Sequence, residues 1–409
     1  MSGILVGAGS VREALAQLLV EARAVTDGTV ADYIPELAMA KPDQLSVSMV
    51  SVLGHSYDAG ETDDTFTIQS ISKPFVYALV HAHLGRNALH KRVGFEPSGE
   101  PFNAISLDGA GRPANPMINA GAIMVSALVT GATPGERFES IRSGLSGFAG
   151  RELGMHDRVY RSESVTGHRN RALASLMLST GLLPRDVHDA TDVYFRQCAI
   201  EVTTGDLALM GATLANDGIN PVTGDRVVDA QSAQDTLALM SSCGMYDRSG
   251  EWGVMVGLPA KSGVSGGIVG VKPGQFAVGT YSPPLDAAGN SVRGVAILER
   301  LSQEYGAHLL AHPFAPISPV IELRTDADAG VVLRLQGELD FVAVEQVLHS
   351  VDELNVATTV GDRVILDLSA VTLISRVARQ LLVAALDRSR NSGLLVRVLD
   401  PHDLFVTHR

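Results

Sequence analysis

The sequence predicts an α+β domain over residues 1–312 and a small α/β domain over residues 319–409. In the first region, strand-like patterns occur near both ends and helical spacing fills the middle, so one sheet is expected to join distant parts of the chain. The stretch 312–319 contains three prolines and is the expected boundary. Beyond it, strand and helix patterns alternate within about a hundred residues, a common size for one domain.

The elements of the first region follow from the period of their apolar residues. Leu15, Leu18 and Leu19 share helical spacing, whereas Leu45–Leu53 alternates apolar and polar side chains as a strand does. A turn at Asp58-Ala59-Gly60 is expected to lead to a second strand ending near Ile68. Helices are expected at 11–24, 74–84, 171–179, 204–216 and 298–312, and further strands at 253–257, 267–271, 275–281 and 292–297.

The second region has the same two kinds of pattern in shorter alternation. Strands are expected at 331–336, 363–368 and 394–398, and helices at 341–351 and 378–388. Helices between strands indicate a β/α unit that forms its own small core.

Composition and charge exclude several classes of function. The 45 acidic and 32 basic residues give a formal charge of -13, which disfavours nucleic acid or an anionic membrane as the main partner. Cys198 and Cys243 form no CxxC pair, so no disulfide framework is implied and a reducing cytoplasm fits. The N-terminus lacks a secretion pattern, and the apolar runs are too short to span a bilayer. The histidines show no ligand spacing, so no metal and no cofactor is expected.

A candidate nucleophile lies where a strand pattern gives way to a helix. Ser70 and Lys73 stand three residues apart, so on a helix their side chains share a face and can meet. The unpaired N–H groups of a first helical turn can serve as oxyanion donors. Burial near the positive end of a helix would lower the pKa of the lysine and let it act as a base.

Two further patterns bear on this assignment. Lys261-Ser262-Gly263 opens a strand, and serine hydrolases of the β-lactamase and penicillin-binding type carry Lys-Thr/Ser-Gly on the strand beside their nucleophile. Gly263-Val264-Ser265-Gly266-Gly267 also fits the Gly-x-Ser-x-Gly elbow of α/β-hydrolases, but that elbow lies between a strand and a helix. Because a strand pattern follows here, Ser265 is expected to be a structural loop residue.

Several ordered segments over residues 1 to about 310 resemble the serine-dependent glutaminase family. They are Val30–Pro35, Gln69–Pro74, Asn115–Ile123, Ser162-Glu163, Arg169-Asn170, Asp192–Phe195, Cys243–Asp247 and Lys261–Val264. The resemblance implies a β-lactamase-like fold, with a mixed sheet and a helical cluster, and hydrolysis of L-glutamine to L-glutamate and ammonia. It also implies assembly into a homodimer or homotetramer.

The resemblance also assigns roles to individual residues. Ser70 corresponds to the acylated nucleophile, Lys73 to its base and Tyr246 to the tyrosine that helps protonate the leaving ammonia. The N–H of Val264 corresponds to an oxyanion donor, together with that of Ser70. The substrate-binding positions correspond to Tyr33, Ser70, Asn119, Glu163, Asn170, Tyr194, Tyr246 and Val264. A carboxylate for the ammonium of an amino acid and amides for its carboxylate suit this substrate.

The Gly- and Pro-rich stretch 94–116 is expected to form a lid.

The C-terminal region resembles the STAS domain (sulfate transporter and anti-sigma factor antagonist). Gly337–Phe341 and Val364–Val371 carry this resemblance. It implies a docking or regulatory module with a protein partner. In regulatory members an Asp-Ser pair precedes a helix and its hydroxyl is phosphorylated, but here Ser375-Arg376 stands in that place. Arg376 therefore puts the usual switch in doubt and leaves Ser375 as the candidate acceptor.

Two other functions remain open at this stage. The chain could be a β-lactamase or penicillin-binding type hydrolase proper, which shares both lysine motifs, although no export signal is seen. It could also be a non-catalytic amino-acid-binding regulatory protein on an enzyme scaffold. Penicillin hydrolysis without ammonia release would favour the first, and undiminished glutaminase activity in a Ser70→Ala variant would refute the proposed mechanism.

Overall fold

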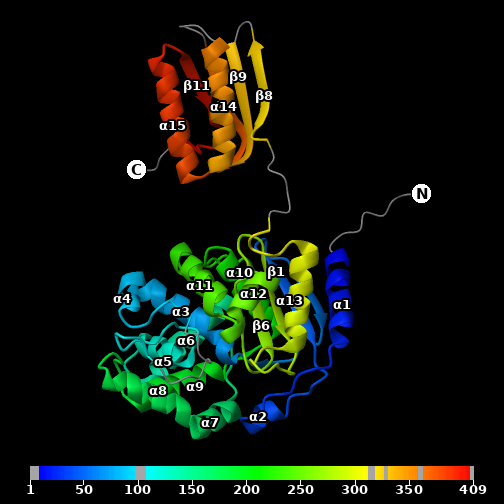
Figure 1. Cartoon of the computed structure of the whole chain (residues 1–409), viewed down its shortest axis with the longest axis vertical. Coiled ribbons are helices and arrows are strands. Elements are labelled where there is room, and N and C mark those ends of the chain that lie inside the picture. The colour runs from blue at the N-terminus through cyan, green and yellow to red at the C-terminus, as the bar shows by residue number, and fades with distance from the viewer. Residues whose placement is uncertain (1–8, 98–106, 312–317, 327–329, 358–362, 406–409) are drawn as a thin grey trace, which may run out of the picture. The chain divides into compact units, whose positions relative to one another are not determined.

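The computed structural model describes residues 9–97, 107–311, 318–326, 330–357 and 363–405 (Figure 1). The chain forms two compact units, residues 1–311 and 312–409. Unit 1 combines an antiparallel sheet with a large helical part, which confirms the predicted α+β class. Within the described residues, no helix is both long enough and apolar enough to span a bilayer.

The five-stranded sheet of unit 1 joins the two ends of that unit. Its strands are β1 (Ser46–Ser51), β2 (Ser56–Gly60), β5 (Ala260–Ser262), β6 (Gly267–Lys272) and β7 (Phe276–Tyr281), in the order β2-β1-β7-β6-β5. Every neighbouring pair is antiparallel, so the expected mixed sheet is wrong for this unit. Three of the four pairs are joined by short connections, which only antiparallel strands can use. A separate short pair is formed by β3 (Phe66–Thr67) and β4 (Glu201–Val202).

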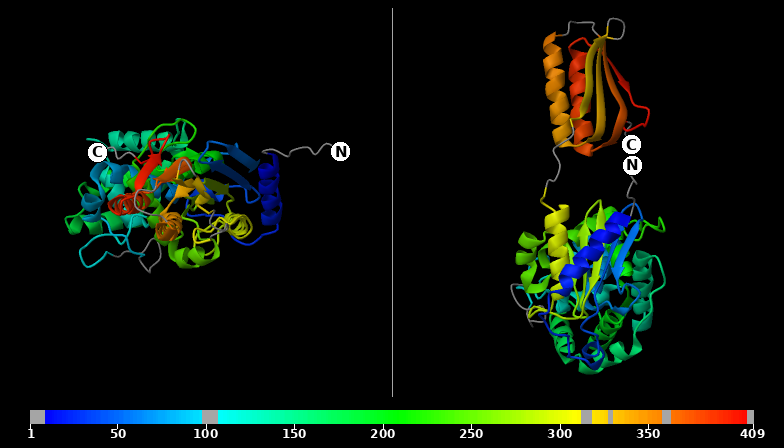
Figure 2. Two further views of the ribbon diagram at one scale, coloured as in Figure 1. Left: turned by 90° about the horizontal axis from the view of Figure 1, so that it is seen from above. Right: turned by 90° about the vertical axis from the view of Figure 1, so that its right-hand side faces the viewer.

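Helices cover both faces of this sheet. Helices α1 (Gly9–Arg23) and α13 (Val292–Tyr305) pack on one face, where Leu19, Ile268 and Leu298 belong to one apolar cluster. Helix α10 (Thr204–Ala215) packs on the other face, where Leu207 and Val269 belong to the largest cluster. Figure 2 shows this sandwich from two further directions.

The remaining helices of unit 1 form the helical part that surrounds α3. They are α2 (Pro35–Ala38), α3 (Ser72–Leu84), α4 (Arg86–His90), α5 (Asn119–Leu128), α6 (Pro134–Ala149), α7 (Asp157–Thr166), α8 (His168–Ser179), α9 (Val187–Cys198), α11 (Ala230–Cys243) and α12 (Ser249–Met255), with the single 3-10 turns η1 (Gln69–Ile71) and η2 (Tyr246–Arg248).

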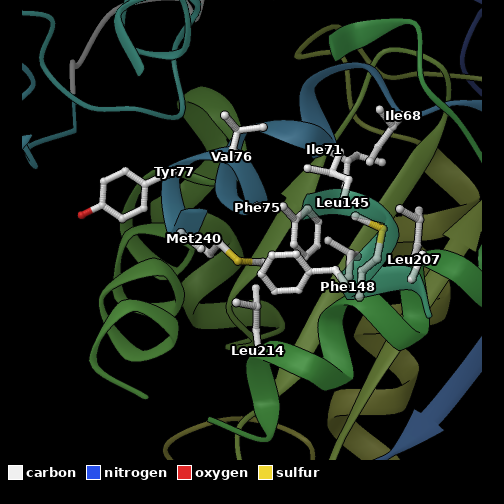
Figure 3. Close-up of a cluster of buried hydrophobic side chains, with 14 of the residues drawn as sticks. Ile68, Ile71, Phe75, Val76, Tyr77, Leu145, Phe148, Leu207, Leu214 and Met240 are labelled. Atoms are coloured by element: carbon white, nitrogen blue, oxygen red, sulfur yellow. The ribbon is translucent and has the colours of Figure 1, made fainter. Parts of the chain in front are cut away.

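Helix α3 is fixed by the main core. The rings of Phe75 and Phe148 meet edge to face, with centroids 5.2 Å apart, and lie between Leu145, Leu214 and Met240 (Figure 3). Each large buried side chain of this kind contributes about 1.5–3 kcal/mol when it is withdrawn from water. These contacts hold α3 at a fixed place among α6, α10 and α11.

Three predicted elements of unit 1 are wrong. Residues 253–255 belong to α12 and residues 256 and 257 follow its end, so no strand forms here; Trp252 and Val256 are buried one turn apart while Val254 is exposed. Residues 292–297 open α13, whose N-cap Ser291 accepts a hydrogen bond from the Gly294 N–H. The expected turn at 58–60 lies within β2, since the hairpin turns at residues 52–55.

Unit 2 is a four-stranded mixed sheet with helices on one face. Its elements are β8 (Val320–Asp326), β9 (Gly330–Leu339), α14 (Phe341–Ala357), β10 (Arg363–Ile374), α15 (Arg376–Asn391) and β11 (Leu395–Leu399), with strand order β11-β10-β9-β8. Sequence reasoning missed β8 and located the other five elements. Ser375 caps α15, and its Oγ accepts a hydrogen bond from the Ala378 N–H at 3.3 Å.

Candidate active site

Ser70 lies in η1, between the short strand β3 and helix α3. Its neighbours Ile68 and Ile71 are fully buried in the main core, which fixes this turn. The preceding residue, Gln69, has a φ of 48°, in the left-handed region that side chains other than glycine rarely adopt. Such a backbone costs about 1–3 kcal/mol, and strain of this kind concentrates at functional sites.

Lys73 is buried at the start of α3, one turn after Ser70. Its Nζ donates hydrogen bonds to Asn119 Oδ1 at 2.7 Å and to the Met117 carbonyl at 3.2 Å. Burial lowers the pKa of Lys73 to about 8. At pH 7 about a tenth of Lys73 is therefore neutral, and this neutral form can act as a general base.

Tyr246, in η2, is distant from Ser70 in the sequence but lies beside it in the fold. Its side chain is hydrogen-bonded to Ser70, and its hydroxyl donates to the Ser262 carbonyl at 3.1 Å. Burial raises the pKa of Tyr246 well above its usual value, so the phenol keeps its proton. The φ of Tyr246 is 57°, the second strained backbone beside the nucleophile.

A network of amides and a phenol lies beyond Lys73. The Asn119 Nδ2 donates to Asn170 Oδ1 at 3.0 Å, and the Tyr194 hydroxyl donates to Asn119 Oδ1 at 3.3 Å. Asn119 stands at the first position of α5, and Asn170 lies in the first turn of α8. The network therefore joins two helix starts to the lysine.

A buried carboxylate, Glu163, also belongs to the site. The Tyr33 hydroxyl donates to Glu163 Oε1 at 2.7 Å. Burial raises the pKa of Glu163, and hydrogen bonds from Tyr33 and Gln69 oppose that increase. A buried carboxylate in a concave site is suited to bind a cationic group of a ligand.

One cavity of about 400 Å³ brings most of these residues together. Seven of the nine predicted site residues line it: Tyr33, Ser70, Asn119, Glu163, Asn170, Tyr194 and Val264. Lys73 and Tyr246 reach the same place through their hydrogen bonds to Asn119 and Ser70. Val264 lies in the tight turn between β5 and β6, which is closed by hydrogen bonds from the Gly263 and Gly266 N–H groups to the Gly267 and Gly263 carbonyls.

Sequence reasoning missed several residues of this cavity as site members. Gln69, Thr166, Gly167, Arg169 and Cys198 also line it. Gln69 precedes Ser70 and Arg169 precedes Asn170 in the sequence. Their position next to predicted site residues was the one feature that could have identified them. For Cys198, burial raises the pKa of the thiol to about 12, which keeps it neutral.

The residues expected to form a lid are described only at their two ends. Residues 98–106 lie outside the described residues. The N–H groups of Gly94 and Glu96 donate to the carbonyls of Pro113 and Ala114, at 2.8 and 3.1 Å. The two described ends therefore lie side by side.

The distribution of titratable groups bears on the chemistry available here. Among the residues that the structure describes, no group of three or more His, Cys, Asp or Glu side chains could hold a metal ion. The cavity instead combines a hydroxyl, a lysine with a lowered pKa, a protonated phenol and a buried carboxylate. This set can support nucleophilic attack on a carbonyl of a small ligand whose cationic group is held separately.

Comparisons with known proteins identify a family for each of the two regions of the chain. The Glutaminase family model matches residues 28–310, and the STAS domain model matches residues 319–404. The glutaminase of Corynebacterium glutamicum is 44% identical over 394 residues, which are 96% of this chain and 94% of the relative.

Two solved structures extend the comparison. Mglu has a TM-score of 0.86 and 38% identity, covering 96% of this chain and 99% of its own, and it has also been solved in its glutamate form. A probable glutaminase, ybaS, has a TM-score of 0.72 and 38% identity, covering 75% of this chain and 99% of its own.

Proposed function

The chain belongs to the glutaminase family and is a glutaminase, and we propose that it hydrolyses L-glutamine through an acyl-enzyme on Ser70 with Lys73 as the general base. One observation carries this mechanism. Ser70 lines a cavity that Glu163 also lines, Tyr246 is hydrogen-bonded to Ser70, and Lys73, with a pKa of about 8, is hydrogen-bonded to the lining residue Asn119. Nucleophile, base, acid and substrate anchor are thus all within reach of one small molecule.

Acylation begins with proton transfer from Ser70. Neutral Lys73 takes the hydroxyl proton as Ser70 Oγ attacks the side-chain amide carbon of glutamine. The carbonyl oxygen becomes an oxyanion, for which the N–H groups of Ser70 and Val264 are the proposed donors. The C–N bond then breaks, Tyr246 delivers a proton so that the nitrogen leaves as ammonia, and protonated Lys73 gives its proton to Tyr246, which restores both groups.

Deacylation repeats these steps with water as the nucleophile. A water molecule attacks the glutamyl ester on Ser70 and gives up one proton to the same groups. The ester C–O bond breaks, Ser70 regains its proton, and L-glutamate leaves. Each step needs only protein groups and water, so no cofactor enters the proposed reaction.

The α-ammonium and α-carboxylate of glutamine are bound by other residues than those that act on its side-chain amide. Glu163 accepts the α-ammonium, and Asn119 and Asn170 donate to the α-carboxylate. Tyr33 and Tyr194 provide rigid walls with polar tips. Mglu has been solved in a glutamate form, and glutamate carries the same α-ammonium and α-carboxylate as glutamine, which supports glutamine as the substrate class.

Ammonia release from glutamine tests the mechanism. Ser70→Ala and Lys73→Ala are each expected to lower kcat by several powers of ten, as the loss of an essential nucleophile or base does. Ser265→Ala is the matched control, since Ser265 lies only a few residues from the site, in the turn between two strands, and is also buried. Full activity of Ser70→Ala, or loss of activity only in Ser265→Ala, would refute Ser70 as the nucleophile.

We also propose where the enzyme acts, how it assembles and what it binds. We expect a cytoplasmic location, a homodimer or homotetramer, and a protein partner for the STAS domain. Both described cysteines are free and buried, as a reducing compartment favours. Light scattering of the purified chain would measure the assembly, and a monomer would contradict it.

A further inference from the structure

The corner between helices α7 and α8 forms one side of the active-site cavity. Helix α7 ends at Thr166, α8 begins at His168, and Gly167 joins them. A side chain at Gly167 would overlap the Phe195 ring and the Glu163 carbonyl, so the corner is tightly packed and needs glycine. Five residues of this corner line the cavity: Glu163, Thr166, Gly167, Arg169 and Asn170.

The formal charges of the cavity wall come from this same corner. Among the described residues that line the cavity, Glu163 and Arg169 are the two with a charged side chain. Glu163 is buried whereas Arg169 is exposed to solvent, so the acid lies inside the cavity and the base lies at its mouth. This pair is complementary to a ligand that carries one cationic and one anionic group. An amino acid is such a ligand, since its α-ammonium and α-carboxylate share one carbon atom.

The neutral amides of the site cannot select a carboxylate by its charge. Asn119 and Asn170 donate through side-chain N–H groups, and the carbonyl of an amide accepts such hydrogen bonds as a carboxylate does. Lys73 is bonded to Asn119 Oδ1 and to the Met117 carbonyl, and it must be neutral to act as the base. A guanidinium keeps its charge and can form two parallel hydrogen bonds with a carboxylate. Arg169 is therefore the lining group that can distinguish a free α-carboxylate.

Arg171, the next arginine of α8, has a different position. It donates to the Ser164 carbonyl of α7, and its guanidinium lies over the Phe195 ring of α9, 5.6 Å from the ring centre. These contacts hold α8 against its neighbours, and Arg171 does not line the cavity. Residues two apart on a helix point to different faces, so Arg169 is directed away from this packing.

We propose that Arg169 is a specificity-determining residue: its guanidinium pairs with the free α-carboxylate of glutamine, beside the Glu163 carboxylate that accepts the α-ammonium. The side-chain amide of the substrate then lies towards Ser70, and its charged end lies towards the mouth. The pair admits free glutamine and rejects compounds whose α-carboxylate is absent or bound in an amide, such as a glutamine residue within a peptide. This inference rests on the proposed binding of the α-ammonium at Glu163 and adds one residue to the proposed substrate contacts.

The probe is γ-aminobutyramide, which is glutamine without its α-carboxylate. It keeps the ammonium and has a single amide, so ammonia release reports cleavage of the same bond. We compare kcat/KM for both compounds in the full-length enzyme and in its Arg169→Gln variant. The variant is expected to lose about tenfold on L-glutamine, as the loss of a hydrogen bond between charged groups does, and less than about twofold on γ-aminobutyramide. Where turnover of γ-aminobutyramide is too slow to measure, its Ki against L-glutamine replaces kcat/KM.

Two further arginine variants serve as controls. Arg169→Lys keeps the positive charge and is expected to recover part of the loss on L-glutamine. Arg161→Gln removes an exposed arginine of α7 that does not line the cavity, so it is expected to leave kcat/KM for both compounds unchanged. Equal losses on both compounds in Arg169→Gln would mean that the residue only supports the fold, and no loss on either would mean that it does not contact the substrate. Both results would overturn the proposal.

Glu163→Gln separates this inference from the proposed function on which it rests. Both compounds carry the ammonium, so this variant is expected to weaken both to the same extent. An effect on neither compound would refute the proposed ammonium site at Glu163. A loss confined to L-glutamine in Arg169→Gln would still show in that case that Arg169 recognises the α-carboxylate.

Discussion

The side-chain nitrogen of Lys261 lies 4.1 Å from the centre of the Tyr246 ring, and both side chains donate to the carbonyl of Ser262. Lys261 is completely buried in β5. Burial and the nearby Lys73 hold the pKa of Lys261 well below its usual range. Two neighbouring buried lysines disfavour each other's charge, which adds to the effect of burial on the pKa of Lys261. Its contact with the Tyr246 ring and the shared Ser262 carbonyl suit Lys261 to a positioning role: it holds Tyr246 in place.

The variant Lys261→Met tests that role. It keeps the length and most of the volume of the side chain but removes the hydrogen bond to Ser262, so Tyr246 loses its support. We expect kcat to fall at least about tenfold while KM changes little, because the substrate anchors are untouched. Lys272→Met is the matched control, since Lys272 is a buried lysine of β6 whose Nζ bonds the His308 carbonyl. Equal losses in both variants would mean that Lys261 only stabilises the fold.

The pH dependence of kcat/KM should report Lys73. Burial lowers the pKa of Lys73 to about 8, and only its neutral form can take the Ser70 proton. Below pH 8 the protonated fraction grows, so kcat/KM is expected to fall about tenfold per pH unit. Tyr246 has a raised pKa and keeps its proton over this range. Initial rates between pH 5 and pH 10 measure the profile, and a flat acid side would argue against a lysine base.

Glu163→Gln should separate substrate binding from chemistry. The substituted amide keeps the shape and can still accept the Tyr33 hydrogen bond, but it has no charge for the α-ammonium. We expect KM to rise by about 30-fold or more, with a smaller effect on kcat. Because burial raises the pKa of Glu163, KM of the unmodified enzyme should also rise as pH falls and the carboxyl takes up a proton. Glu139→Gln, on the exposed face of α6, should leave KM unchanged.

Much of the site was predictable because its residues fall in short sequence motifs. The Ser70–Lys73 spacing indicates one face of a helix, and the collinear motifs supply the other positions. The strained backbones at Gln69 and Tyr246 had no such signal, since neither is glycine or asparagine. Their conformations are imposed by tertiary packing, which only the structure reveals. Cys198 is a similar case, because a buried thiol has the same sequence signature whether or not a cavity adjoins it.

The errors in the fold have a common physical cause. Residues 253–257 and 292–297 are short apolar stretches, and a short apolar stretch is compatible with a buried strand or with one face of a helix. The N-cap at Ser291 indicates a helix for the second stretch, and the one-turn spacing of the buried Trp252 and Val256 indicates a helix for the first. The long periodic segments, such as 11–24 and 204–216, were located correctly because several turns share one face.

Gly121→Ala should damage the site through the fold. Gly121 lies in the first turn of α5, and a Cβ there would overlap the carbonyl of Asn115. We expect a loss of about 2 kcal/mol in the free energy of unfolding, as overpacking causes, and a shift of Asn119 that raises KM. Gly135→Ala is the control, because Gly135 opens α6 with room for a methyl group. Thermal unfolding and initial rates measure both effects, and equal stability of the two variants would contradict the steric argument.

Removal of residues 312–409 should leave glutaminase chemistry intact. All nine proposed site residues lie between Tyr33 and Val264, and the apolar clusters that support them contain only residues of unit 1. The STAS unit has its own apolar cluster, from Leu333 to Leu382 among the fully buried members. We therefore expect kcat and KM of the truncated chain within about twofold of the full-length values. Any function of the STAS domain should then appear as a change in oligomer size or partner binding, measured by light scattering and by co-purification. A loss of kcat greater than tenfold, with the truncated chain still folded by circular dichroism, would show that the STAS domain supports the catalytic unit directly.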